Sequence, residues 1–353
     1  MHVPAREGHQ ADQRHRVMVE LGDRSYPVDI GPGVRRMLPA VVERIGAARV
    51  AIVSARPEDD AVPDPGVPSV RLPARDGEPD KNLANVHALC ERFAAFGLTR
   101  SDAVISCGGG TTTDVVGLAA ALYHRGVAVI HLPTSLLAQV DASVGGKTAV
   151  NLPAGKNLVG AYWQPAAVLC DTDYLRTLPA REWINGYGEI ARAHFIGAGE
   201  LRGLPVEEQI ARSVALKAAV VAQDERDSGL RHILNYGHTL GHALEIATGF
   251  DMRHGEGVAV GTVFAGRLAA ALGLIDDRRA QEHLEVVRHY GLPTQLPAGV
   301  EVATLLAVMR RDKKSTNTGL TFVLDTADGP RLVPAVPAEL VVRTLETMQP
   351  VAA

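Results

Sequence analysis

The stretch from Asp102 to His124, DAVISCGGGTTTDVVGLAAALYH, decides the fold. Its first part, DAVISC, is typical of a buried strand, and TDVVGLAAALYH is typical of a helix, with three consecutive glycines between them. Such a turn lets a phosphate group approach the backbone at the start of a helix, where N–H groups and the helix dipole favour an anion. In a parallel α/β sheet a nucleotide pyrophosphate binds at this place, although a plain tight turn can have the same local sequence.

The segments around this stretch repeat the alternation of strand and helix. ARVAIVS (48–54) and VAVIHLP (127–133) predict strands, and ANVHALCERFAAFGL (84–98) has the spacing of an amphipathic helix. Ahead of them, RVMVEL and SYPVDI flank a polar turn at 22–24 and predict an antiparallel hairpin. Strands that alternate with helices pair in parallel, so this half predicts a doubly wound, Rossmann-like α/β domain.

Beyond about residue 175 the sequence predicts mainly helices. The helical segments are REWINGYGEIARAHF (181–195), VEEQIARSVALKAAVVAQ (206–223), GLRHILNYGHTLGHALEIAT (229–248), GEGVAVGTVFAGRLAAAL (255–272), RAQEHLEVVRHY (279–290) and VATLLAVMRR (302–311). One late strand pair, LTFVLDT and RLVPAV, follows them. We therefore expect a flexible tail over 1–15, an α/β domain over 16–175 and a mostly α-helical domain over 176–353.

Composition excludes several classes of protein. The net charge is −4, whereas a general nucleic-acid binder carries a basic excess. The N-terminus lacks the apolar segment of a secretory signal, and no run of about 18 uncharged apolar residues occurs, so we expect a cytoplasmic protein without a membrane span. Cys90, Cys107 and Cys170 are widely spaced, which argues against disulfides and thiolate zinc sites and favours a packing role.

A second polar stretch, PTSLLAQVDASVGGKTAVNLPAGKN, runs from residue 133 to residue 157. It places Asp141, Lys147, Lys156 and Asn157 among serines, threonines and glycines in an otherwise apolar part of the chain. A structural surface loop rarely concentrates so many hydrogen-bond donors and glycines. The segment therefore predicts a phosphate or cofactor site.

A histidine cluster predicts a metal site in the helical half. His238 and His242 are four residues apart on one predicted helix, so both project from the same face. His254 begins the next helical segment, and Glu189 lies on an earlier one. Imidazole and carboxylate ligands suit a divalent metal such as Zn²⁺. Either both His238 and His242 bind the metal, or one binds it while the other serves the substrate; two internally hydrogen-bonded histidines are the structural alternative.

Basic residues accompany this cluster. Arg231 stands one helical turn before Asn235 and two before His238, so we expect all three on a similar helix face. An arginine there can bind a carboxylate in a bidentate manner. The other basic residues of this half, taken singly, are typical of solvated surface: Lys217, Arg311, Lys313 and Lys314.

Taken together, these motifs resemble the dehydroquinate synthase family of sugar-phosphate cyclases. The resemblance runs from about Arg16 to Met348 through GGGTTTDVVG, YHRGVAVIHLPTSLLAQVDASVGGKTAVN, GKNLVGAYWQP, LNYGHTLGHALE, RHGEGVAVG and DKK. It implies an N-terminal NAD-binding domain, a helical metal-binding domain and an active site between them.

The resemblance also implies roles for individual positions. The metal ligands, for Zn²⁺ or Co²⁺, would be Glu189, His238 and His254, which leaves His242 to face the substrate. The NAD contacts would be Glu78, Lys81, Gly109, Gly110, Asp114, Thr134, Ser135, Asp141, Lys156, Thr177 and Leu178. The catalytic positions would be Lys147, Lys217, Asp227, Arg231, Asn235 and His242. The other substrate contacts would be Asp141, Asn157, Arg125, Arg192 and one of Lys313 or Lys314. Arg125 matches an arginine that reaches a neighbouring subunit, which implies a homodimer.

The reaction implied by the family is the conversion of 3-deoxy-arabino-heptulosonate 7-phosphate to 3-dehydroquinate and phosphate. NAD⁺ oxidises one alcohol, phosphate leaves by β-elimination, the hydride returns, and an intramolecular aldol step closes the ring, so NAD⁺ is regenerated. The metal would lower the pKa of the alcohol that is oxidised. Arg231 would hold the carboxylate, which predicts a carboxylated substrate rather than sedoheptulose 7-phosphate.

Three features depart from the usual pattern of the family. Arg192 stands where a lysine is expected, Asp227 stands where a glutamate is expected, and the segment between Phe195 and Lys217 is short. They favour, as an alternative to the shikimate-pathway enzyme, an aminodehydroquinate synthase that acts on the 4-amino analogue in the aminohydroxybenzoate pathway of secondary metabolism. A metal-dependent polyol dehydrogenase, which would accumulate NADH, and an inactive binding protein are two further classes; the intact metal ligands argue against the latter.

Overall fold

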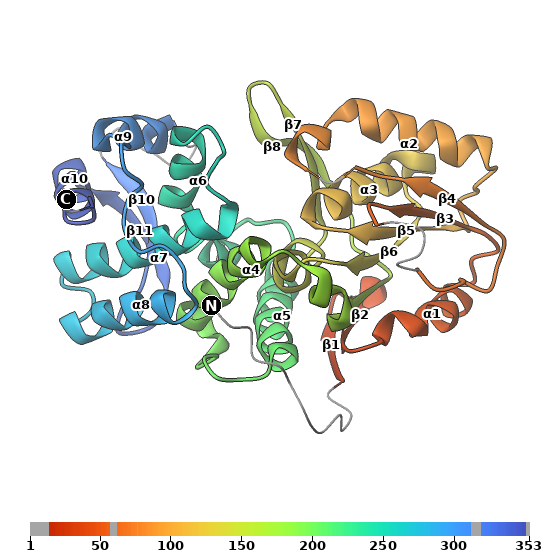
Figure 1. Ribbon diagram of the computed structural model, residues 1–353, viewed down its shortest axis with the longest axis horizontal. Coiled ribbons are helices and arrows are strands. Elements are labelled where there is room, and N and C mark those ends of the chain that lie inside the picture. The colour runs from red at the N-terminus through yellow and green to blue at the C-terminus, as the bar shows by residue number, and fades with distance from the viewer. Residues whose placement is uncertain (1–13, 57–61, 76, 312–318, 351–353) are drawn as a thin grey trace.

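The computed structural model describes residues 14–56, 62–75, 77–311 and 319–350, and it has two halves. Figure 1 shows the α/β half at one end and the helical half at the other, with α4 (Ala180–Ala193) and α5 (Val206–Gln223) between them. Lys313 and Lys314, two of the expected substrate contacts, lie outside the described residues, as does nearly all of the expected tail over 1–15.

A seven-stranded sheet forms the α/β half and confirms the predicted fold class. Its order is β1-β2-β9-β6-β5-β3-β4, and all neighbouring strands are parallel except the predicted hairpin of β1 and β2. The strands are β1 (His15–Val19), β2 (Tyr26–Gly31), β3 (Val50–Ser54), β4 (Ser69–Pro73), β5 (Ala103–Gly108), β6 (Ala128–Pro133) and β9 (Ala167–Asp171). The glycine-rich turn therefore lies at the carboxyl end of β5, in the interior of the sheet.

Both faces of this sheet are covered, as a parallel sheet requires. Successive residues of β5 alternate between two cores, with Ile105 packed on the side of α1 (Leu38–Ile45) and Val104 on the side of α2 (Leu83–Ala95) and α3 (Gly110–Leu122). Cys107 and Cys170 are buried in the apolar interior and Cys90 is partly buried, which confirms their packing role.

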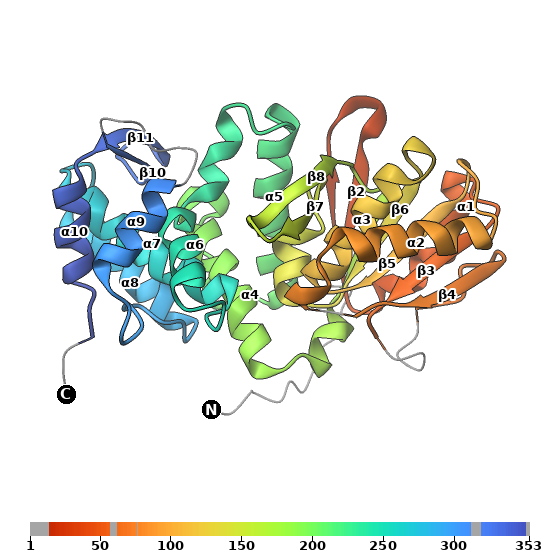
Figure 2. The same cartoon turned by 90° about the horizontal axis from the view of Figure 1, so that it is seen from above.

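The polar stretch after β6 forms secondary structure that the sequence did not predict. Residues Ala138–Ala142 make a short π-helical turn, and β7 (Lys147–Leu152) pairs with β8 (Gly155–Tyr162) as an antiparallel hairpin. Figure 2 shows this hairpin beside α3 and on the side of the α/β half that faces α5. The segment thus extends from the sheet towards the helical half.

The helical half is built around α7, which packs against α4, α6, α8 and α10. Its remaining elements are α6 (His238–Ala247), α7 (His254–Ala271), α8 (Asp277–His289), α9 (Val302–Arg311), α10 (Ala338–Glu346) and the antiparallel pair β10 (Leu320–Leu324) and β11 (Arg331–Val336). One core joins these helices to β1 and β2 through Val19 and Tyr26, so the two halves share apolar interior. In the part of the chain that the structure describes, no helix combines the length and apolarity needed to cross a membrane.

The predicted helix over 229–248 is wrong at its start. Leu230–Asn235 is a 3₁₀ helix, and α6 begins only at His238, after Gly237 adopts a left-handed φ of 76°. A Cβ atom at Gly237 would lie 2.9 Å from the carbonyl oxygen of Val258 on α7, so the close approach of α7 leaves room only for glycine. Because of this break, Arg231, Asn235 and His238 do not share one helix face.

Candidate active site

Three side chains from three helices converge in the helical half. Glu189 of α4, His238 at the start of α6 and His254 at the start of α7 each offer one ligand atom, and these atoms all lie within 4.8 Å of one another. His254 Nε2 lies 3.0 Å from Glu189 Oε1, and His238 Nε2 lies 3.5 Å from the same oxygen. The arrangement gives two imidazoles and a buried carboxylate, a set that suits a borderline-soft divalent metal.

Backbone contact between α4 and α7 allows these ligands to meet. A Cβ atom at Gly188 would lie 2.2 Å from the carbonyl oxygen of Gly255, and one at Gly255 would lie 1.8 Å from the carbonyl oxygen of Asn185. Only glycines permit the two helices to come this close. Glu189 and His254 are the chain neighbours of these glycines, so the contact sets the distance between the two side chains.

In both His238 and His254, the ring nitrogen that does not face Glu189 contacts a hydrogen-bond acceptor. His238 Nδ1 lies 3.0 Å from the carbonyl oxygen of Tyr236, and His254 Nδ1 lies 2.8 Å from Glu245 Oε1. Contacts of this kind fix the tautomer and orientation of metal-binding imidazoles. Glu245 was missed in the sequence, although it stands seven residues after His238 on α6 and therefore shares its face.

The charges of the cluster differ between its two histidines. Burial lowers the pKa of His238 to about 3, and the charge of Glu189 offsets only part of that effect. Burial also lowers the pKa of His254, but its hydrogen bonds to Glu189 and Glu245 outweigh burial and raise that pKa to about 10. Burial raises the pKa of Glu189, yet the charge of Arg192 and the hydrogen bond with His254 bring it down to about 2. The metal-free chain therefore holds an ionised carboxylate beside one charged and one neutral imidazole.

A second charged group lies next to the cluster. The ammonium of Lys217 on α5 lies 2.8 Å from Asp141 Oδ1, and a guanidinium nitrogen of Arg192 lies 3.6 Å from the same oxygen. Arg192 Nε also lies 2.5 Å from Glu189 Oε2, and Arg192 donates a hydrogen bond to the carbonyl of Leu234. Burial raises the pKa of Asp141, but the charges of Lys217 and Arg192 hold it below its usual range. Arg192 thus connects the metal cluster with Asp141.

Lys147 and Asp227 form a third pair, with 2.5 Å between the ammonium and a carboxylate oxygen. Burial raises the pKa of Asp227, but Lys147 and neighbouring cations lower it overall. Arg231 lies nearby and is only 1% exposed, because its guanidinium donates to the backbone carbonyls of Glu225 and Gly145. In this conformation a substrate carboxylate reaches Arg231 only after those backbone contacts move.

The residues expected to bind NAD gather partly around the glycine-rich turn. Gly109 precedes the first residue of α3, and the N–H of Thr134 donates to the carbonyl of Gly108, so the ends of β5 and β6 lie together. Lys81 lies 2.5 Å from Asp114, whose pKa is raised to about 6 because burial outweighs the lysine charge. Gly110 and Ser135 lie at these strand ends and Lys156 lies on the hairpin, whereas Glu78 begins a 3₁₀ turn before α2 and contacts the hairpin through Asn151 and Lys156.

Several expected site residues lie apart from the metal cluster or at its edge. His242 is exposed, with its ring centre 5.3 Å from that of His238, so it lies beside the cluster. Asn157 is exposed on the hairpin, and Arg125 is exposed in the loop after α3. Thr177 accepts a hydrogen bond from Arg56, and the next residue, Leu178, packs in the helical core.

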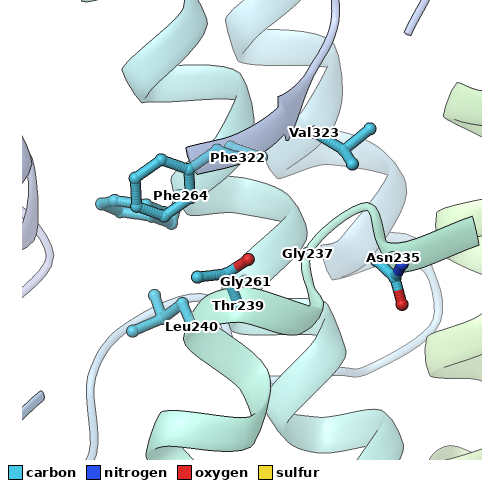
Figure 3. Close-up of a pocket in the computed structure, with 9 residues that line it drawn as sticks. Asn235, Gly237, Thr239, Leu240, Gly261, Phe264, Phe322 and Val323 are labelled. Carbon is cyan, nitrogen blue, oxygen red and sulfur yellow. The ribbon is translucent and has the colours of Figure 1, made fainter. Parts of the chain in front are cut away.

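Cavity volume alone does not locate this site. A pocket of about 10 Å³, room for roughly one water, lies between α6, α7 and β10, and Figure 3 shows the residues that line it. Asn235, an expected catalytic residue, lies at its edge beside Gly237. A wider groove of about 940 Å³ lies between the start of α4 and residues 291–300. None of the three metal-cluster residues lines either space.

Comparison with known protein families gives two adjoining matches. The model described as 3-dehydroquinate synthase N-terminal matches residues 71–185, and the model described as 3-dehydroquinate synthase C-terminal matches residues 188–315. This chain belongs to the 3-dehydroquinate synthase family. It is thus an enzyme of the sugar-phosphate cyclase type, as the sequence resemblance predicted.

Relatives in the family carry two names. A protein of Amycolatopsis mediterranei (strain S699), named "Putative aminodehydroquinate synthase", is 69% identical over 95% of this chain and 95% of its own length. A protein of Nitrobacter hamburgensis (strain DSM 10229 / NCIMB 13809 / X14), named 3-dehydroquinate synthase, is 42% identical over 90% of this chain and 91% of its own.

Solved structures confirm the fold. A 2-deoxy-scyllo-inosose synthase complexed with carbaglucose-6-phosphate, NAD⁺ and Co²⁺ is 27% identical, with a TM-score of 0.86 over 95% of this chain and 100% of its own. A glycerol dehydrogenase of Sinorhizobium meliloti 1021, described as probable, is 17% identical, with a TM-score of 0.63 over 90% of this chain and 94% of its own. The latter likeness shows the fold alone, so the fold by itself does not separate cyclases from polyol dehydrogenases.

Proposed function

We propose that the protein is an aminodehydroquinate synthase, a cyclase that eliminates phosphate from the 4-amino analogue of 3-deoxy-arabino-heptulosonate 7-phosphate. The main support is the Amycolatopsis relative, which is 69% identical over 95% of the chain, whereas the relatives named 3-dehydroquinate synthase are 41–43% identical. Arg192, which departs from the usual family pattern, lies buried between Glu189 and Asp141, where it can affect the choice of substrate.

The second candidate is the shikimate-pathway reaction, in which the hydroxy substrate gives 3-dehydroquinate. Relatives with the name 3-dehydroquinate synthase support it, and the sequence analysis placed it first. Both candidates require a carboxylated substrate. They differ only in the substituent at one carbon, which is an amine in the first candidate and a hydroxyl in the second.

We propose NAD and a divalent metal, Zn²⁺ or Co²⁺, as cofactors. The donor set of Glu189, His238 and His254 fits such a metal, and the glycine-rich turn at the end of β5 fits the pyrophosphate of NAD. Structural neighbours hold NAD⁺ together with Co²⁺ or Zn²⁺. When bound, the metal lowers the pKa of a substrate hydroxyl, and NAD⁺ accepts and returns a hydride.

The chain's own side chains would bind and orient the substrate. Lys217 and Arg192 keep Asp141 ionised, so that its carboxylate can accept hydrogen bonds from substrate hydroxyls. Lys147 is half-exposed beside Asp227, which suits a lysine that takes an incoming phosphate. The remaining proposed substrate contacts are Asn157, Arg231, Asn235, His242 and one of Lys313 or Lys314.

We further propose a cytoplasmic homodimer. Arg125 lies exposed in the loop after α3, where it can reach a second copy of the chain. Its φ of 63° shows that the loop holds it in a left-handed backbone conformation. Size measurement in solution tests this assembly, and recovery of activity on mixing inactive Arg125→Ala subunits with inactive Glu189→Gln subunits tests the shared site.

The test of the reaction is phosphate release from the amino and the hydroxy substrate, each with NAD⁺ and Co²⁺ or Zn²⁺. We expect release without lasting NADH and with a higher kcat/KM for the amino substrate. A preference for the hydroxy substrate would establish the second candidate. Accumulation of NADH with a simple polyol would instead indicate a dehydrogenase. Glu189→Gln is the control, because it removes a proposed metal ligand and should release no phosphate.

A further inference from the structure

The buried carboxylate of Glu245 connects two functional groups that come from different halves of the molecule. Its Oε1 accepts from His254 Nδ1 at 2.8 Å, and its Oε2 accepts from the ammonium of Lys156 at 2.7 Å. The side chain is only 5% exposed. Each oxygen therefore has its own partner, one at the proposed metal and one on the hairpin of β7 and β8.

The contact with Glu245 determines which ring nitrogen of His254 is available to bind a metal. Both oxygens of Glu245 are occupied by nitrogen partners, and a carboxylate in this position can only accept hydrogen bonds. His254 Nδ1 must then carry a proton, and its Nε2, 3.0 Å from Glu189, is the nitrogen left to bind a metal. His238 Nδ1 contacts a neutral carbonyl, so of the two proposed ligand histidines His254 is the one whose Nδ1 has a charged acceptor.

The contact with Lys156 fixes the tip of the hairpin to α6. Lys156 stands at the second position of β8, and its ammonium lies 4.3 Å from the ring centre of Phe250 and 3.7 Å from Glu78. Asn151 on β7 donates to the same Glu78 carboxylate at 2.7 Å. Glu245 thus contributes an acceptor from the helical half. The other polar members of this group, Lys156, Glu78 and Asn151, come from the α/β half.

We propose that Glu245 is a positioning residue that couples the metal ligand His254 to Lys156, so that metal binding and the placement of the hairpin tip depend on each other. This inference rests on the proposed metal site. If one carboxylate holds both partners, removal of either partner changes how firmly the other is held.

A competing arrangement makes Glu245 a ligand itself. Ligand atoms of His242, Glu245 and His254 also lie within 4.8 Å of one another. The contact between Glu245 Oε1 and His254 Nδ1 argues against it, because that nitrogen would have to lose its proton and turn from the carboxylate to the metal. The group of Glu189, His238 and His254 requires no such change, since both Nε2 atoms already face Glu189.

The test is titration of metal-free protein with Co²⁺, followed by the visible absorption of bound cobalt. We expect the Kd for Co²⁺ to rise roughly 10–100-fold in Glu245→Ala and less in Glu245→Gln, whose amide oxygen can still accept from His254. Lys156→Gln should weaken Co²⁺ binding as well, and the double variant should lose no more than Glu245→Ala alone. Glu207→Gln is the matched control, a buried glutamate of α5 that binds Thr172.

Several results would overturn the inference. Unchanged Co²⁺ binding in folded Glu245→Gln and Glu245→Ala would leave the residue a purely structural role. Additive losses for the Glu245 and Lys156 variants would remove the coupling. A cobalt spectrum changed in coordination type by Glu245→Gln, with His238→Ala still binding tightly, would make Glu245 a ligand. Wild-type protein that binds no Co²⁺ would refute the proposed metal site itself, which separates that failure from this one.

Discussion

Substitution of Gly188 by alanine tests whether backbone contact between α4 and α7 builds the metal site. The new Cβ atom would lie 2.2 Å from the carbonyl oxygen of Gly255, whereas ordinary contact begins at 3.4 Å, so the helices must separate by about 1.2 Å. Metal–ligand distances tolerate only about 0.2 Å of change. Since Glu189 and His254 are the adjacent residues, we expect the Kd for Co²⁺ to rise roughly 100-fold or more.

The expected change in stability is smaller than the roughly 2.8 kcal/mol that a 100-fold change in Kd represents. Alanine in a helix gains about 1 kcal/mol over glycine, whereas overpacking costs about 1–3 kcal/mol, so the net loss should be about 0–2 kcal/mol in urea unfolding. The matched control is Gly257→Ala on α7, where the new Cβ would lie 3.0 Å from the carbonyl oxygen of Gly241 and needs a shift of only tenths of an ångström. Wild-type cobalt affinity in Gly188→Ala would refute the reasoning.

Three further predictions follow from the site and the loop beside it. Arg192→Lys should lower the free energy of unfolding by about 0.5–1.5 kcal/mol in urea, because the part-buried hydrogen bond to the carbonyl of Leu234 is lost; an unchanged midpoint would contradict this. A chelator should stop phosphate release and lower the melting temperature, and Zn²⁺ or Co²⁺ should restore both, whereas full activity without metal would exclude a metal role. Asp224 accepts backbone hydrogen bonds from Ser228, Gly229 and Arg231, and these hold its pKa below the usual value. A depressed carboxyl pKa stabilises the fold above the unfolded-state value of about 4 and loses this effect as pH falls. The stability gap between wild type and Asp224→Asn should therefore be full at neutral pH and close in acid; a gap that persists in acid would contradict the assignment.

Periodicity predicted most of the fold correctly, because the strands and helices of this chain bury one or two faces in a regular pattern. The hairpin of β7 and β8 escaped prediction because its glycines and polar residues resemble a binding loop, and its strands form through pairing with each other. The break at Gly237 escaped for a different reason, since only the neighbouring α7 requires it. Tertiary contact decided both features.

The candidate site was predicted mainly through the family resemblance. Spacing alone left open whether His238 or His242 binds metal, and the structure directs His238 Nε2 towards Glu189 while His242 lies exposed at the edge. Glu245 escaped prediction because its role depends on contact with a ring nitrogen of His254, which lies on another helix. The burial of Arg231 also depends on the carbonyl of Gly145, 86 residues away in the chain, which no local pattern indicates.

The core that joins β1 and β2 to the helical half has a consequence for how the chain unfolds. Val19 and Tyr26 share one core with residues of α5 and α7, and their strands contact α5, although more than 180 positions separate Val19 from α5 in the chain. A cut at the proposed boundary near residue 175 would leave part of that interior exposed on both fragments. The first two strands therefore complete the core around α5, and we expect the protein to melt in one cooperative transition rather than as two independent units.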